Sequence, residues 1–186
     1  MAEVEMNVTL QLSKEVVLES LMRDYGQQIL QLVYLCIRDH TLAEDITQEV
    51  FLKAYKGLDH FRGESDVKTW LYRIAMNESK KYLRSWSFRN IFSTWLKEKD
   101  QKLEAVETVG VEQLVMGKLK QRTILRHVLN LPHQYRQIIV LYYYEELSGK
   151  QMAEILQISE EAVRQKLHRA RRQLKQLLEQ EGEAWI

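Results

Sequence analysis

The residues whose types and spacing most clearly suggest chemistry lie near the C-terminus, in a helix predicted to start after Ser159. Between Glu161 and Glu179 the only charged residues are cations, and these are Arg164, Lys166, Arg169, Arg171, Arg172 and Lys175. At about 100° per residue, one helical face is apolar. The apolar side chains on it are Val163, Leu167, Ala170, Leu174, Leu177 and Leu178. Side chains that can bind DNA lie on or beside the opposite face, namely Glu161, Arg164, Gln165, His168, Arg169 and Arg172.

The elements before this helix decide between a solvated charged surface and a DNA-binding helix. Ser148 and Gln151 have the spacing of a capping box, which predicts a short helix over 149–156. Residues 157–158 form a tight turn, and Ser159 then caps the long helix. A short helix, a tight turn and a cationic second helix are typical of a helix-turn-helix that enters the major groove. Ser159 therefore joins the candidate DNA-binding residues.

A second basic segment, 61–89, interleaves cations with aromatic residues. Its cations include Arg62, Lys68, Arg73, Lys80, Lys81 and Arg84, and its aromatic residues include Phe61, Trp70, Tyr72, Tyr82 and Trp86. Aromatic rings stack on unpaired bases and cations follow phosphates, so this composition suits melted DNA. Some of the same residues, Trp70 among them, could equally belong to a hydrophobic core.

The helix predicted over 42–58 carries an acidic surface with a leucine at its centre. Asp45, Gln48 and Glu49 lie opposite the apolar face, and Leu52 lies among them. Such a surface resembles a protein-docking site. A single leucine exposed to solvent with no function is the alternative.

The sequence offers no catalytic or metal-ligating residues and predicts no cofactor. The five histidines, at 40, 60, 127, 133 and 168, show no ligand spacing, and no glycine-rich phosphate loop occurs. The one cysteine, Cys36, lies in an apolar stretch and is interpreted as a core residue. An enzyme is therefore the least favoured class of function.

The fold class is predicted to be all-α, because 186 residues contain one proline and seven glycines. We expect two small helical domains, over 18–86 and 118–181, the second of which contains the helix-turn-helix. Residues 1–17 are expected to form a frayed tail or a short helix, and 182–186 a tail. Residues 87–117 are interpreted as a linker, whose aromatic start (86–96) either packs on its own domain or docks on a partner. Neither a signal peptide nor a membrane span is visible, so a cytoplasmic protein is expected.

The net charge of +1 argues at first against a nucleic-acid partner. The charges are segregated, however. Residues 61–89 carry a net charge of +4 and residues 118–180 carry +6, while the head (1–60), the segment 90–117 and the last six residues are acidic. The sequence thus contains two basic zones that its net charge conceals.

Several long motifs resemble bacterial RNA polymerase sigma factors of the extracytoplasmic function (ECF) type. The first block contains AEDITQEVFLKAY at 43–55 and VKTWLYRIAMN at 67–77. The second contains LPHQYR at 131–136, MAEIL at 152–156 and VRQKLHRAR at 163–171. The resemblance covers about residues 18–86 and 118–180, with the order and spacing of that family.

The resemblance implies a specificity subunit of RNA polymerase that is not itself an enzyme. Asp45, Gln48, Glu49 and Leu52 would dock on the clamp helices of the β′ subunit. The minus-ten promoter element would be recognised and opened by Phe61, Asn77, Lys80, Lys81 and Arg84. The helix from Ser159 would bind the minus-thirty-five element, and the linker would follow the polymerase cleft past the β subunit. The family also implies control by an anti-sigma factor, commonly membrane-tethered.

A conventional helix-turn-helix repressor or activator is the main alternative. It explains residues 148–180 but gives no role to the surface around Leu52 or to the segment around Trp70. Tight binding to a duplex operator without any affinity for core polymerase would favour it.

Overall fold

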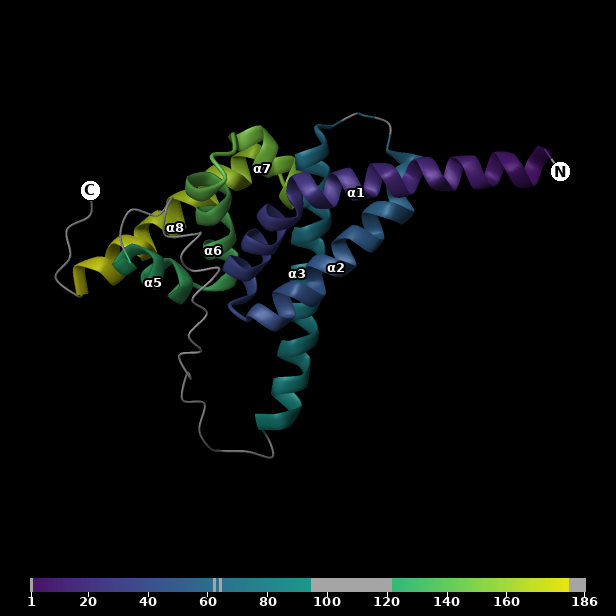
Figure 1. The fold of residues 1–186 in the computed structure, drawn as a ribbon. Coiled ribbons are helices and arrows are strands. Elements are labelled where there is room, and N and C mark those ends of the chain that lie inside the picture. The colour runs from purple at the N-terminus through teal and green to yellow at the C-terminus, as the bar shows by residue number, and fades with distance from the viewer. Residues whose placement is uncertain (1, 62, 64, 95–121, 181–186) are drawn as a thin grey trace.

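The computed structural model describes residues 2–61, 63, 65–94 and 122–180. In these residues every regular element is a helix or a helical turn, which confirms the predicted all-α fold class. The helices form two groups, one from each half of the chain, that lie side by side (Figure 1).

The first group consists of α1 (Ala2–Ile37), α2 (His40–Gly57), the 3₁₀ turn η1 (Leu58–His60) and α3 (Val67–Thr94). Its core includes one face of α1, where Ile29, Leu32, Val33 and Cys36 recur every one to three residues and are fully buried, as predicted for Cys36. Asp39 is the N-cap of α2, and its side chain accepts a hydrogen bond of 3.0 Å from the N–H of Leu42. The three long helices pack against one another in pairs.

Two of these helices are longer than the sequence predicts. α1 begins at Ala2, so that most of the expected N-terminal tail or short helix is the continuation of one long helix. α3 continues past residue 86 to Thr94, where the linker was expected. Neither extension contains glycine or proline, so nothing local ends the helix. The rest of the predicted linker, with Trp95 and Leu96, lies outside the described residues.

The second group consists of α5 (Arg122–Asn130), α6 (His133–Ile139), the π-helical turn η2 (Val140–Tyr144), α7 (Gly149–Leu156) and α8 (Glu160–Gln180). Pro132 occupies the N-cap position directly before α6, where its missing N–H costs the helix no hydrogen bond. In η2 the N–H of Glu145 donates to the carbonyl of Val140 at 3.1 Å, five residues earlier. The helix that starts with α6 therefore continues to Tyr144 with a widened last turn.

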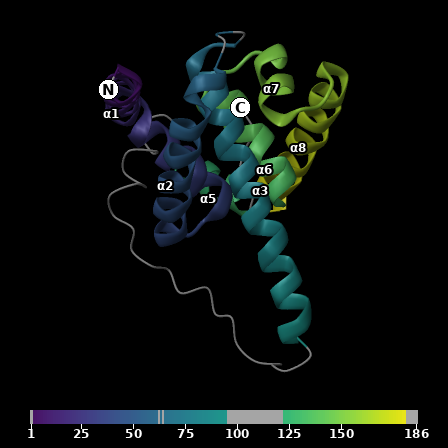
Figure 2. The ribbon, with the colours of Figure 1, turned by 90° about the vertical axis from the view of Figure 1, so that its right-hand side faces the viewer.

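The two groups contact each other through α1 with α6 and through α3 with α7 (Figures 1 and 2). Arg136 of α6 is buried at the first of these contacts. Its guanidinium donates to the carbonyl of Leu129 at 2.5 Å and to the carbonyl of Cys36, near the end of α1, at 2.8 Å. Burial lowers the pKa of Arg136 to about 10. A cation at the C-terminus of α1 satisfies a carbonyl that the helix itself leaves unpaired.

Among the described residues we find no helix that is both long enough and apolar enough to cross a bilayer.

Leu71 and Leu52 provide a matched test of this packing, since both are leucines in helices of the first group. Leu71 is fully buried and Leu52 is 53% exposed. We expect Leu71→Ala to lower the free energy of unfolding by about 2–5 kcal/mol, because it leaves a cavity. Leu52→Ala should change it by less than about 0.5 kcal/mol. Urea denaturation followed by circular dichroism measures both, and equal effects would contradict the assigned core.

Candidate nucleic-acid and protein interfaces

The exposed face of α8 brings together the candidate residues of the C-terminal half. Glu161, Arg164, Gln165, His168 and Arg169 line one shallow hollow on the surface of this helix. Arg172, one turn further on, and the capping residue Ser159 are also exposed. On the opposite side, Val163, Leu167, Ala170, Leu174 and Leu178 are buried, as predicted. The helix is thus anchored along one side and presents hydrogen-bonding and cationic groups on the other.

The turn that positions α8 is fixed by local hydrogen bonds. The Ser148 hydroxyl accepts from the N–H of Gln151 at 3.3 Å, and the Gln151 amide oxygen accepts from the N–H of Ser148 at 3.0 Å. This is the predicted capping box at the start of α7. Gln157 ends α7 in the left-handed conformation, with φ of 56°. Ser159 then accepts from the N–H of Ala162 at 3.1 Å, so both capping residues that the sequence predicted are confirmed.

Glu161 orients two of the candidate DNA-binding side chains. Its carboxylate accepts hydrogen bonds from the Arg164 guanidinium, with an Nε–oxygen distance of 3.1 Å, and from the Gln165 amide at 3.3 Å. The hydrogen bond from Arg164, followed by that from Gln165, lowers the pKa of Glu161. Glu161 therefore stays ionised at neutral pH and holds Arg164 beside the hollow.

Arg171 belongs to the same cationic stretch but not to this face. Its guanidinium carbon lies 4.9 Å from the ring centre of Tyr142 and 5.5 Å from that of Tyr143. Its Nε also donates to the Tyr143 hydroxyl at 2.9 Å. Stacking on two tyrosines binds this cation to η2, so it contributes to packing.

The candidate residues of α3 follow one face of that helix. Asn77, Lys80, Lys81 and Arg84 recur at the spacing of one helical face, and Trp70 and Arg73 continue this face towards the N-terminus of α3. Lys80, Lys81 and Arg84 are exposed and Asn77 is half-buried. Lys81 donates to Glu78 at 3.0 Å, and Glu78 also pairs with Lys53 of α2 at 2.6 Å. Burial opposes the ionisation of Glu78, but hydrogen bonds from these two lysines outweigh it and lower the pKa of Glu78.

Phe61 joins this face at the N-terminal end of α3. Its ring packs against Trp70 with 4.8 Å between the ring centres. Gly57 leaves room for the indole, because a Cβ at that position would lie 3.1 Å from it. A hollow here is lined by Gly57, His60, Phe61, Ser65, Trp70, Arg73 and Glu154. Arg73 is a site residue that was not among the predicted ones, although it belongs to the basic zone and has the same helical spacing as Asn77 and Lys80.

The acidic surface of α2 is exposed as predicted. Asp45, Gln48, Glu49 and Leu52 all face solvent, while Ile46, Val50, Phe51 and Ala54 are buried on the other side. Glu49 pairs with Lys53 at 3.7 Å. Exposed apolar area framed by carboxylates remains available there to a protein partner.

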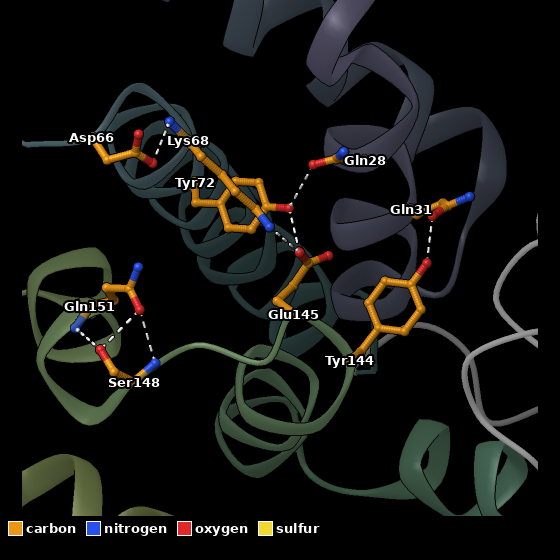
Figure 3. A network of polar contacts seen from close by, with 9 residues as sticks. All are labelled: Gln28, Gln31, Asp66, Lys68, Tyr72, Tyr144, Glu145, Ser148 and Gln151. Atoms are coloured by element: carbon orange, nitrogen blue, oxygen red, sulfur yellow. Dashed lines mark hydrogen bonds and ion pairs between the residues drawn. The ribbon is translucent and has the colours of Figure 1, made fainter.

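A polar network that the sequence did not predict joins the two halves of the chain (Figure 3). Tyr72, a candidate for base stacking, is fully buried, and its hydroxyl donates to the Glu145 carboxylate at 2.5 Å. Lys68 pairs with the same carboxylate at 3.1 Å and lies 5.1 Å from the centre of the Tyr72 ring. Burial, followed by the Glu145 charge, raises the pKa of Tyr72. Tyr144, beside Glu145, donates to Gln31 of α1, and burial raises the pKa of Tyr144 to about 12.

The described residues contain no group of three or more histidine, cysteine or carboxylate side chains that could hold a metal ion.

Both halves of the chain match models of known protein families. The model described as "Sigma-70 region 2" matches residues 21–88, and that described as "Sigma-70, region 4" matches residues 121–174.

Curated relatives match most of the chain. RNA polymerase sigma factor YlaC of Bacillus subtilis is 36% identical over 163 residues, which cover 85% of this chain and 90% of the relative. The ECF RNA polymerase sigma factor SigW of the same organism is 35% identical and covers 83% of this chain and 84% of its own length. The ECF RNA polymerase sigma-E factor of Escherichia coli is 34% identical over 131 residues, covering 68% of this chain and 69% of the relative.

Solved structures share the fold. The sigma factor RpoE in complex with the anti-sigma factor NepR, from Bartonella quintana, aligns with a TM-score of 0.63 at 20% identity. That alignment covers 96% of this chain and 98% of the other. CnrH in complex with the cytosolic domain of CnrY aligns with a TM-score of 0.62, also at 20% identity, over 92% and 96% of the two chains.

The pairing of Glu161 with Arg164 makes a prediction about binding to duplex DNA. Glu161→Gln removes a negative charge and releases the guanidinium, so we expect tighter binding to duplex of arbitrary sequence and a steeper dependence on salt. Fluorescence anisotropy at several salt concentrations measures both. Glu179→Gln is the matched control, because Glu179 pairs with Lys175 at 3.6 Å near the far end of the same helix. An equal gain in both variants, or none in Glu161→Gln, would contradict the assignment of this face.

Proposed function

The chain belongs to the sigma-70 family as a sigma factor of the ECF type, and we propose from this premise how its surfaces divide the work of promoter-directed transcription initiation. A sigma factor binds core RNA polymerase and directs it to promoters. The observation that carries the proposal is the face of α8. It combines cations with hydrogen-bonding groups, and a capped helix-turn-helix holds it outward.

We assign minus-thirty-five recognition to this face of α8. Arg and Gln side chains read base edges in the major groove, while other cations hold phosphates. The residues proposed for this role are Ser159, Glu161, Arg164, Gln165, His168, Arg169 and Arg172.

We assign minus-ten recognition to one face of α3 and the hollow at its N-terminal end. Aromatic rings at Phe61 and Trp70 offer stacking surfaces for an unpaired base, and exposed cations follow along the helix. Phe61, Asn77, Lys80, Lys81 and Arg84 are the proposed contacts, to which the structure leads us to add Arg73.

The polymerase-docking surface is proposed to be the acidic face of α2, formed by Asp45, Gln48, Glu49 and Leu52. Its combination of an exposed leucine with carboxylates suits a basic, partly apolar partner surface such as the β′ clamp helices.

We also propose domain boundaries at 18–86 and 118–181. The chain between the two domains is proposed to lie along the cleft of the polymerase.

We propose that the chain has no catalytic activity of its own, because sigma factors are initiation factors. Control by an anti-sigma factor is supported by the fold, which is shared with RpoE in complex with the anti-sigma factor NepR and with CnrH in complex with the cytosolic domain of CnrY. RNA polymerase acts in the cytoplasm, and we place the chain there.

The docking surface is tested by replacing Asp45 with Lys and Leu52 with Asp in one variant. We expect loss of measurable binding to core polymerase in fluorescence anisotropy, with unchanged helical circular dichroism, because charge and apolar contact are both reversed. The matched control is Glu19→Lys with Met22→Asp on α1. Both variants replace an exposed acidic residue with Lys and an exposed apolar residue with Asp, since Met22 is 50% exposed and Leu52 is 53% exposed. Binding of the α2 variant with the affinity of the control would overturn the docking assignment.

Minus-thirty-five recognition is tested by Arg164→Ala and Arg169→Ala. Each should weaken promoter binding by the holoenzyme by roughly 1–3 kcal/mol where the lost contact is bidentate to a base, and should relax preference at one position of the element. Lys175 is an exposed cation further along α8, and Lys175→Ala should weaken binding to all promoter sequences slightly and to the same extent. Competition between promoter variants in run-off transcription measures this, and unchanged preference in both arginine variants would refute the assignment.

A further inference from the structure

The boundary between the two halves of the chain is built around carboxylates that face cations of α3. Glu145, which follows η2, meets Lys68 at 3.1 Å and Tyr72 at 2.5 Å. Glu154 of α7 forms an ion pair with Arg73. Each pair joins residues more than 70 positions apart in the sequence, so it forms only when the two halves dock.

The geometry of η2 directs Glu145 towards α3. The widened turn ends with Glu145 donating its N–H to Val140, and Glu146 then adopts a left-handed φ of 54°. The next N–H, of Leu147, donates to Leu141 at 3.1 Å. These bonds fix the chain reversal, and the Glu145 side chain is left only 3% exposed against α3 (Figure 3).

One of the two cations held by these carboxylates, Arg73, lies in the part of α3 that we assign to promoter DNA. Arg73 lines the hollow beside Phe61 and Trp70, and Glu154 lines the same hollow from the other half of the chain. The Nε of Arg73 is buried and finds no partner among the described residues. Carboxylates and phosphates bind guanidinium groups in the same way, so Glu154 competes with a DNA phosphate for Arg73.

We propose that Glu145 and Glu154 form an intramolecular latch with Lys68, Tyr72 and Arg73, which holds the free protein closed and covers part of its minus-ten-binding face. The functional meaning of the latch rests on the proposed function, whereas its existence as a closed contact does not. Full contact of the promoter strand with this face then requires the two halves to separate, whereas the α2 surface stays exposed in the closed state.

The chemistry of the latch allows it to open. The Arg73 and Glu154 side chains are 31% and 36% exposed, so water can replace their pairing at small cost. Glu145 is buried more deeply; Lys68 and Tyr72 compensate its charge while the halves are docked, and water does so once they separate. The apparent affinity for a ligand that binds only the open state equals its intrinsic affinity multiplied by the fraction of molecules that are open.

Distances between spin labels on the full-length chain test the closed contact directly. Labels are placed at Glu19→Cys on α1 and Gln176→Cys on α8, two exposed positions outside the latch. The native Cys36 is fully buried, and burial raises the pKa of its thiol to about 12, so it does not compete for label. We expect one narrow distance distribution in the parent chain, and a longer, broader population in Glu145→Gln with Glu154→Gln.

Matched variants separate the latch from a general loss of stability. Glu146→Gln removes the same charge from the exposed neighbour and should leave the distances unchanged. Glu154→Arg should lengthen them, and Arg73→Glu combined with Glu154→Arg should restore the short population, because the swapped pair recreates the attraction. Unchanged distances in both the glutamine variant and Glu154→Arg, with helical circular dichroism retained, would overturn the proposal.

A binding measurement then connects the latch with function. The probe is a single-stranded oligonucleotide carrying the non-template strand of a minus-ten element. Its affinity should rise in Glu145→Gln with Glu154→Gln by the same factor as the open fraction seen in the distances. Open distances without any oligonucleotide binding, in parent or variant, would refute the assignment of minus-ten recognition while the latch stands. Unaltered distances together with oligonucleotide binding would refute the latch alone.

Discussion

A carboxylate removed from water must be neutralised by its neighbours, and Glu145 finds those neighbours only on the other half of the chain. Lys68 supplies a charge and Tyr72 a hydrogen bond, both from α3. This requirement ties the two helical groups together at α3, and Arg136 on the Cys36 carbonyl is a second polar contact between them, beside the buried apolar residues of both halves. The network that connects the halves is therefore polar at these points, and such contacts exchange readily for water or for another charged ligand.

The distribution of charge along the chain also pairs cations with carboxylates from distant parts of the sequence. A net charge of +1 conceals cations concentrated on α3 and α8 and carboxylates concentrated towards the N-terminus. On α8 the cationic face points to solvent, whereas on α3 part of it faces acidic residues of the second half. The protein thus keeps one DNA-facing surface open and satisfies part of the other internally. Low net charge also weakens attraction to DNA of arbitrary sequence, which suits a factor that acts with polymerase.

Local features of the structure could be predicted from the sequence, and contacts between the halves could not. The capping box at Ser148, the cap at Ser159 and the exposed faces of α2 and α8 depend on residues within a turn or two of one another. The pairing of Arg73 with Glu154 depends on docking of distant helices, which helical spacing does not encode. Tyr72 illustrates the difference: its place in a basic, aromatic stretch suggested base stacking, yet docking buries it. The ends of α1 and α3 were misjudged because weak amphipathic patterning does not stop a helix that lacks glycine and proline.

Mapping the 5′ ends of transcripts made on genomic DNA by core polymerase, with and without the purified chain, tests promoter-directed initiation most directly. The account predicts a new and discrete set of 5′ ends when the chain is added. Each should be preceded by the same two short elements at constant spacing, because α3 and α8 belong to one molecule held on one polymerase. A set of 5′ ends identical to that of core polymerase alone would contradict the account.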